Sequence, residues 1–358
     1  MKQFFIALCL PVLLLSITSC QTGRNNKSIP VDALAAHIDS TVYPGNDFFQ
    51  YANGKWFKEN PIAPSEQSSG IFQVIQDTIN SQVLKICKTS AQTASEKGSN
   101  KQKIGDFYFS GMDSTNLNKA GISAIQKYLD QIDAVKDINQ LISSAAFIHR
   151  GSASPMFGFG VGQDSKISSK NAVTIWQGGL SLPDRSYYFE KDERTVKIRE
   201  KFLQHLENMF KILNYDQQKA KLAASNIMKL ETSLASASRK KEDTRDPLKN
   251  YTKLSFKQLS TLTPNFNWLL FNQETGLQNV DTVIVGQPEY LTALNANLKK
   301  FPLEVWKNYM KYQLARGLAS YLNDPTYLEV FKFYSQTIRG VQQPKPRWKR
   351  VVEQTDGY

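Results

Sequence analysis

Histidine is the first residue type to examine for metal or acid–base chemistry, and this chain has three, His37, His149 and His205. Two histidines four residues apart share one face of a helix, so that both imidazoles can reach a single metal ion. No two histidines here come that close in sequence. We therefore expect no metal site in this chain, and we interpret all three histidines as hydrogen-bonded or solvent-facing side chains.

Other catalytic arrangements are also missing from the sequence. It contains no Gly-x-Ser-x-Gly elbow, no histidine near Cys87 and no phosphate-binding loop with a lysine. The glycine run from Gly158 to Gly162 alternates with apolar residues and indicates packing inside a hairpin. We interpret Asp192 and Glu193 as solvated loop charges, although carboxylates distant in sequence can still meet in space. The sequence thus predicts no catalytic residue in this chain.

The first twenty residues have the pattern of an export signal. Met1-Lys2 supplies a positive charge, residues 4–15 are apolar, and Ile17-Thr18-Ser19-Cys20 resembles the cleavage site of a bacterial lipoprotein. The apolar run is too short to span a membrane comfortably. We predict that residues 1–20 are removed as a signal peptide, that Cys20 is acylated, and that residues 21–40 form a polar tether. A plain secretory signal or an uncleaved anchor is the alternative.

Lipidation at Cys20 would place the protein in the bacterial cell envelope, on the periplasmic or the cell-surface side, with the membrane as a partner. Cys9 would leave with the signal, so that Cys87 remains as the one free thiol and no internal disulfide can form. Leu84 and Ile86 surround Cys87 in sequence, which favours a buried, inert cysteine.

The composition is that of a globular protein with a basic surface. Of the 358 residues 41% are hydrophobic and 21% are charged, and 44 Lys and Arg against 32 Asp and Glu give a net charge of +12. The densest basic patches, Arg239–Lys241 and Arg347–Arg350, are interrupted by acids or aromatics. Such a surface suits contact with anionic lipid or simply solubility. No nucleic-acid-binding motif is present, so we expect no DNA or RNA partner.

The spacing of apolar residues predicts a mainly α fold. Asp47 can cap a short aromatic helix that starts at Phe48, and Asn53-Gly54 is expected to end it. The pattern predicts further helices at about 70–87, 103–112, 117–129, 138–149, 196–213, 217–239, 303–322 and 327–338. The absence of a helix breaker predicts one more at 348–357.

A small β element is expected near the middle of the chain. Residues 155–161 and 172–176 alternate around a polar turn and predict a β-hairpin, and residues 282–285 predict a short strand. Thr252 to Ser255 is interpreted as a loop leading to the capped start of a short helix.

Five segments carry a resemblance to a known family. DFFQYANGKW with its continuation to Phe72, KIGDFYFSGMD, QGGLSLPDRSYYF, VGQPEYL and FYSQTIRGVQQPKPRWKRVVE occur in the order found in the neprilysin and endothelin-converting-enzyme family of zinc endopeptidases. The resemblance implies a multi-helical N-terminal lobe over residues 41–358 that covers the substrate cavity of the family. In the complete family enzyme, zinc is held by a His-Glu-x-x-His helix and a later Glu, none of which occurs here.

The resemblance also places two candidate substrate contacts. Phe72 matches the aromatic that helps wall the pocket beyond the scissile bond, with core packing as the alternative. Ser68 occupies the position of a family Arg that grips the C-terminal carboxylate of a peptide, so the resemblance implies endopeptidase action rather than trimming of dipeptides. Gln73 and Gln76 likewise replace charged residues of some relatives.

We therefore expect the N-terminal part of a lipid-anchored, neprilysin-like zinc endopeptidase that acts on small peptides and is inactive alone. The sequence ends at Tyr358 within an expected helix, which favours a frameshift, a gene split or a truncated record, with a separate catalytic half as a partner. A short inactive homologue is the alternative explanation. The alternative function is a non-catalytic peptide-binding or scaffolding lipoprotein, so enzyme status is open from sequence. Phe48–Trp56 and Tyr327–Ile338 are expected to pack on the other half.

Overall fold

The computed structural model describes residues 32, 34–277 and 279–357, which fall into two units that meet in sequence between Ile62 and Ala63. The predicted signal peptide, Cys20 and the first part of the tether lie outside the described residues. Among the described residues, no helix combines the length and the apolar character needed to cross a lipid bilayer.

The first unit is built on helix α2 (Phe48–Glu59). Asp47 caps it by accepting a hydrogen bond from the amide of Gln50 at 2.9 Å, as predicted. The prediction that Asn53-Gly54 ends the helix is wrong, because α2 continues through both residues. Gly54 is buried, and a Cβ there would come within 2.9 Å of Asp39 Cβ. The glycine therefore serves a close approach of the preceding chain rather than a helix end.

Asp39 ties the preceding segment to α2. Its amide donates to the carbonyl of Tyr51 at 2.8 Å, and its carboxylate pairs with Lys58 at 2.6 Å. The hydrogen bond from Lys58, with one from Thr41, lowers the pKa of Asp39 to about 2. Residues in the later part of the expected tether thus fold against α2.

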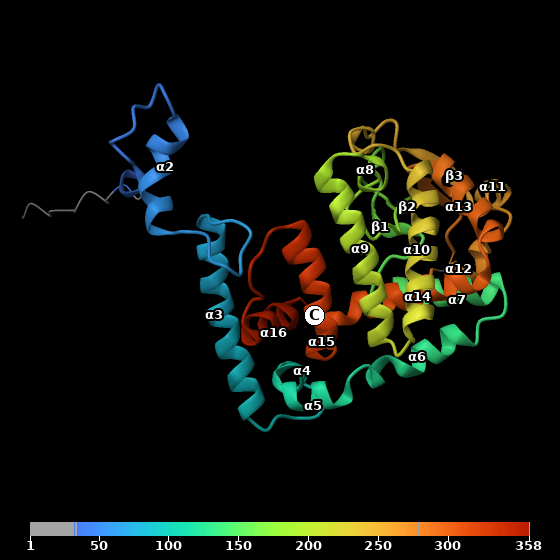
Figure 1. Ribbon diagram of the computed structural model, residues 1–358, viewed down its shortest axis with the longest axis horizontal. Coiled ribbons are helices and arrows are strands. Elements are labelled where there is room, and N and C mark those ends of the chain that lie inside the picture. Colours follow the sequence, from blue (N-terminus) through green and yellow to red (C-terminus); the bar gives the residue numbers. More distant parts are fainter. Residues whose placement is uncertain (1–31, 33, 278, 358) are drawn as a thin grey trace, which may run out of the picture. The chain divides into compact units, whose positions relative to one another are not determined.

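The second unit begins with a small helical group (Figure 1). Helices α3 (Ile71–Gln92), α4 (Asn100–Met112) and α16 (Arg347–Asp356) contact one another and share a core of Cys87, Tyr108, Val351 and Val352. Cys87 is fully buried, as predicted, and burial raises its pKa. Because α16 follows α4 by more than two hundred residues, this group joins segments from the two ends of the second unit.

The larger core is also mainly helical, which confirms the predicted fold class. Helices α5 (Ser114–Ala120) and α6 (Ser123–Asp133) lead into it (Figure 1). Its other helices are α7 (Ile138–His149), α8 (Ser186–Phe189), α9 (Glu193–Ile212), α10 (Gln217–Ala237), α11 (Phe256–Leu262), α12 (Trp268–Thr275), α13 (Pro288–Lys300), α14 (Leu303–Leu318) and α15 (Asp324–Val330).

One four-stranded sheet accompanies these helices, in the order β1-β2-β4-β3. The predicted hairpin is confirmed as β1 (Phe157–Gln163) and β2 (Asn171–Gln177), and the predicted strand at 282–285 is β4 (Thr282–Val285). Strand β3 (Thr252–Ser255), expected as a loop, pairs antiparallel with β4. Leu254 is the one apolar residue of β3, whereas β4 has three, so the sequence of β3 carries a weaker strand signal. Ser255 nevertheless caps α11, as predicted, and forms a capping box with Gln258.

The segment Phe331–Ile338 forms a π-helix that continues α15. The expectation that Tyr327–Ile338 is left uncovered is wrong for its two central aromatics, since Phe331 and Phe333 are 9% and 2% exposed. Phe333 stacks on His205 with ring centroids 4.9 Å apart. In α2, by contrast, Phe48 and Phe49 are exposed among the described residues, as expected.

Candidate functional site

The predicted substrate contacts lie at the start of α3. Ser68 is exposed two residues before Gly70, which precedes the helix, and Phe72 is 84% exposed in its first turn. Phe72 therefore does not pack in a core formed by the described residues. Both side chains are accessible on the same short segment, but their roles in substrate binding remain predictions.

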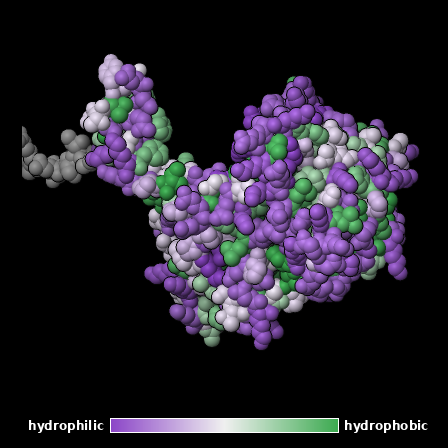
Figure 2. Space-filling model, in the orientation of Figure 1, coloured by the Kyte–Doolittle hydropathy of each residue, from purple (hydrophilic) through white to green (hydrophobic). Residues whose placement is uncertain are grey.

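An apolar face continues from Phe72 along α3. Ile71, Ile75, Ile79 and Ile86 recur at helical spacing and are 53%, 48%, 40% and 55% exposed. The hydrophobic surface over the start of α3 is visible in Figure 2. This periodicity correctly predicted the helix, but no described residue of the second unit covers the apolar face of α3. Exposed apolar faces of this length are typical of interaction or binding surfaces.

The opposite side of α3 is fixed to α16 by a buried lysine that pairs with a half-exposed aspartate. Lys349 is 9% exposed and its ammonium group lies 2.6 Å from Asp77 Oδ1 and 3.0 Å from Glu66 Oε1. Burial lowers the pKa of Lys349, but the hydrogen bonds to Asp77 and Glu66 outweigh it, so that its pKa is raised. The segment that carries Ser68 is thus held between Glu66 and Asp77. Sequence reasoning missed this cluster and placed Lys349 in a surface basic patch.

A cleft of about 640 Å³ opens beside this segment. One wall is Ser65–Gln67, directly before Ser68, and another is formed by the π-helix residue Tyr334 and by Arg350 of α16. Arg350 stacks its guanidinium 3.8 Å from the ring centroid of Tyr327. Glu353, on the same wall, pairs with Lys345 at 2.8 Å. The cleft offers cations, carboxylates and aromatic faces to a ligand.

The three histidines lie at separate places. The Nε2 atom of His149 is 2.9 Å from the carbonyl oxygen of Pro155, and burial lowers its pKa to about 4. His205 Nδ1 lies 3.0 Å from Glu329 Oε1, whereas its buried Nε2 has no hydrogen-bond partner. The prediction of a satisfied side chain is therefore wrong for one nitrogen of His205, because Phe333 and the neighbouring aromatic rings surround it.

These positions do not fit a zinc ion. His37 lies in the first unit beside Trp56, and His149 and His205 are each enclosed by different aromatic rings. Within the described ranges, no group of three or more His, Cys, Asp or Glu side chains is placed to hold a metal.

Comparison with known proteins gives the family. The N-terminal model described as peptidase family M13 matches residues 44–358. Endothelin-converting enzyme 1 of Rattus norvegicus is 26% identical over 89% of this chain and 43% of its own length. Neprilysin-3 of Drosophila melanogaster is 25% identical over 89% of this chain and 43% of its own length.

Solved structures agree with this assignment. The zinc metalloprotease Zmp1 of Mycobacterium tuberculosis, in complex with an inhibitor, superposes with a TM-score of 0.84 at 29% identity, over 90% of this chain and 49% of that one. PepO of Lactobacillus rhamnosis shares the fold at 16% identity, with a TM-score of 0.72 over 88% of this chain and 50% of that one. The chain thus spans about half the length of the proteins that it matches. It belongs to peptidase family M13, and what it represents is the N-terminal region of that family.

Proposed function

We propose that this chain is the cavity-covering N-terminal part of a neprilysin-like zinc endopeptidase that cleaves small peptides. Its role would be to restrict access to the reaction chamber and to contribute Phe72 to the wall of the substrate pocket. The zinc ion and the general base would be held by residues outside this chain, so that these 358 residues would neither bind zinc nor cleave peptides alone.

The observation that supports this proposal best is the uncovered face of α3. Four isoleucines and Phe72 are exposed on a helix whose other side is fixed by Lys349, Asp77 and Glu66. An exposed apolar face on a helix of fixed position is typical of an interface, here with another part of the same enzyme. The relatives that match this chain are about twice its length, which provides such a part.

The location is a proposal from sequence. An acyl group on Cys20 would anchor the protein to the cell envelope, and the basic surface would suit approach to anionic lipid. Globomycin treatment of producing cells tests this anchor, because it blocks the lipoprotein signal peptidase. Accumulation of the unprocessed precursor supports the anchor, and unchanged processing would exclude it.

Zinc content and peptidase activity test the enzymatic proposal. The purified chain is expected to contain no stoichiometric zinc and to leave a quenched fluorescent peptide uncut. Addition of a second half that carries His-Glu-x-x-His is expected to produce chelator-sensitive cleavage. Chelator-sensitive cleavage by the chain alone would refute the proposal.

The second candidate is a peptide-binding or scaffolding lipoprotein without catalysis. The exposed α3 face and the cleft beside Ser65–Gln67 favour it, since both are accessible in this chain. Binding of short peptides to that cleft, together with no gain of cleavage when a second half is supplied, would favour this candidate.

A further inference from the structure

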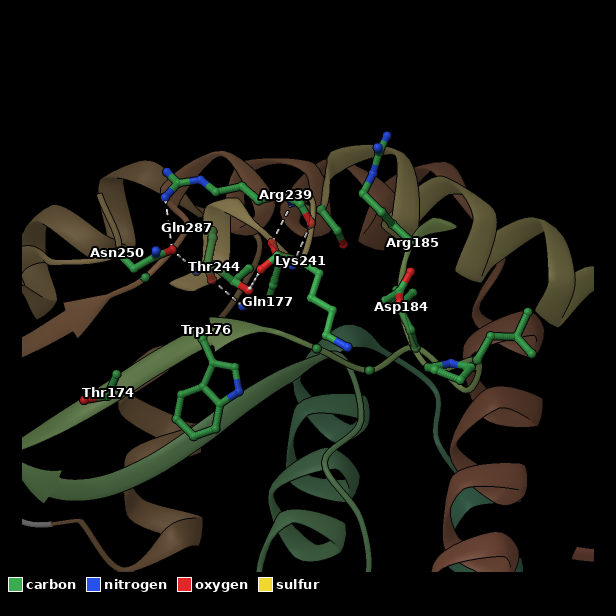
Figure 3. Close-up of a pocket in the computed structure, with 17 residues that line it drawn as sticks. Thr174, Trp176, Gln177, Asp184, Arg185, Arg239, Lys241, Thr244, Asn250 and Gln287 are labelled. Atoms are coloured by element: carbon green, nitrogen blue, oxygen red, sulfur yellow. Dashed lines mark hydrogen bonds between the residues drawn. The ribbon is translucent and has the colours of Figure 1, made fainter. Parts of the chain in front are cut away.

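A second cavity, of about 530 Å³, opens along the loop Gln177–Arg185 (Figure 3). Pockets for small ligands have volumes of roughly 300–1,000 Å³. The end of β2, this loop, the residues after α10 and the turn before α13 form its walls. It shares no lining residue with the cleft beside Ser65–Gln67. It is therefore a separate candidate site.

Two buried tyrosines hold the loop from behind. The hydroxyl of Tyr290 donates to the carbonyl of Gly178 at 2.6 Å, and that of Tyr309 donates to the carbonyl of Gly179 at 2.6 Å. Gly179 has φ +73°, and a Cβ there would come within 2.7 Å of the Tyr309 hydroxyl. Only glycine fits this position without strain.

The next turn of the loop is held by Glu231, which is fully buried. Its carboxylate accepts hydrogen bonds from the amide of Ser181 at 3.0 Å, from the hydroxyl of Ser181 at 2.6 Å and from the hydroxyl of Tyr188 at 2.6 Å. Because these groups fix the loop before any ligand arrives, binding would not have to order it.

The amide side chains at the cavity already have hydrogen-bond partners within the protein. The side chain of Gln177 exchanges two hydrogen bonds with the backbone of Arg239, at 2.7 and 3.1 Å, and the backbone N–H of Gln177 donates to the side-chain oxygen of Gln287. Arg239 is neutralised by Glu289 and also donates to Asn250 (Figure 3). A sugar would find few free partners for its hydroxyls, and unpaired polar groups oppose binding.

Trp176 provides an aromatic wall. Atoms of its indole lie over both Gly158 and Gly160, and a Cβ on Gly158 would overlap the indole nitrogen. One face of the ring therefore rests on β1, while the side chain is 42% exposed and lines the cavity. The two glycines of the hairpin, interpreted from sequence as packing, make this flat placement possible.

Lys241 provides the charge. In Figure 3 its ammonium group extends into the cavity, whereas Arg185 points away from it. No carboxylate among the described residues lies within salt-bridge distance of Lys241. The one acidic side chain in the lining, Asp184, accepts hydrogen bonds from the amide and hydroxyl of Ser186. The cavity thus presents a ring face beside an uncompensated cation.

We propose that this cavity binds a peptide segment in which an aromatic or proline ring lies next to a carboxylate. The ring would stack on Trp176, and the carboxylate would pair with Lys241. The choice of a peptide as the ligand rests on the proposed function. The site would hold such peptides away from the α3 segment and would favour acidic aromatic sequences among them.

Isothermal titration of the purified chain with the dipeptide N-acetyl-Phe-Glu-amide tests this proposal without any need for cleavage. N-acetyl-Phe-Gln-amide removes the charge, N-acetyl-Ala-Glu-amide removes the ring, and glucuronic acid represents an anionic sugar. The Phe-Glu peptide is expected to bind most tightly. Lys241→Gln should weaken it about fivefold, the effect of a partly exposed ion pair. Trp176→Ala should weaken it about tenfold, the effect of one aromatic stacking contact.

Matched variants separate the site from the general surface charge. Lys240→Gln removes the neighbouring exposed lysine, which does not line the cavity, and should leave binding unchanged. Trp176→Phe keeps a ring if Trp176→Ala does not fold, and should retain part of the affinity. Equal binding of all four probes, or equal loss in Lys240→Gln and Lys241→Gln, would overturn the proposal. Cleavage by the completed enzyme without this binding would reject the site and leave the proposed function standing.

Discussion

The ammonium group of Lys349 lies 2.6 Å from Asp77 Oδ1, which fastens α16 to the second turn of α3 across more than two hundred and fifty residues of sequence. Glu66 joins the same cation at 3.0 Å. The segment that carries Ser68 and Phe72 therefore takes its position from a lysine near the other end of the described chain.

Replacement of Lys349 by Met tests this fastening. It keeps the aliphatic stem but leaves Glu66 and Asp77 without their main cation. We expect a loss of about 2 kcal/mol in the free energy of unfolding, below the range for fully buried pairs because Asp77 is half exposed. Hydrogen exchange at residues 71–79 should also accelerate. Lys219→Met, which removes an exposed pair with Asp216, should change stability by no more than about 0.5 kcal/mol. Equal effects of the two variants would contradict a positioning role for Lys349.

Replacement of Ile75 by Glu tests whether the α3 face is covered in the complete enzyme. The side chain is 48% exposed, so the stability of this chain should change by no more than about 0.5 kcal/mol. Assembly with the second half, and cleavage by the assembled enzyme, should be lost because a charge would be buried. Ser81→Glu places the same charge on another side of α3 and should preserve assembly. Normal cleavage by the Ile75 variant would show that the face stays open to solvent.

His149 should make stability depend on pH. Burial lowers its pKa to about 4 from 6.5, so the unfolded chain takes up a proton that the folded chain resists. The folded state is therefore favoured most above pH 6.5 and loses stability as the pH falls towards 4. The total loss is roughly 3 kcal/mol, at about 1.4 kcal/mol per pKa unit. The free energy of unfolding, measured with urea at pH 4.5, 5.5, 6.5 and 7.5, should change less steeply with pH in His149→Gln than in the wild type or in His37→Gln. An unchanged slope would mean that another group causes the dependence.

Ser68→Arg tests the contact that the family resemblance places there. In the completed enzyme an arginine should favour peptides with a free C-terminal carboxylate over their amides by about tenfold in kcat/KM, because a hydrogen bond between charged groups contributes roughly 1.5 kcal/mol. Gln67→Arg adds the same charge one residue away and should not produce this preference. No gain for the free carboxylate would remove Ser68 from the substrate site.

The local elements were largely predictable because their signals are local. Apolar spacing located α3 and α7, the absence of a breaker located α16, alternation located β1 and β2, and Asp47 capped α2 as expected. The predictions were wrong where contacts with another segment of the chain determine the local structure. Gly54 resembles a helix end in sequence, yet it lies within α2, where Asp39 packs closely against it.

It was harder to predict from sequence which apolar helix faces are buried and which are exposed. Phe72 and Phe333 both occur in apolar helical patterns, but one is 84% exposed and the other 2% exposed. Hydrophobic spacing shows that a helix has an apolar face without showing whether another segment reaches it. His205 likewise gives no signal in sequence of its enclosure by Phe333 or of its unpaired Nε2.

By itself, the sequence determined the mainly helical class, the family resemblance and the lack of paired histidines, because each depends on residue types at short, fixed spacings. Only the tertiary structure decided that Lys349 meets Asp77, that the face of α3 is open within the described residues, and that Trp176 and Lys241 line one cavity. These relationships join segments far apart in the chain, and no local spacing encodes the distance between them in space.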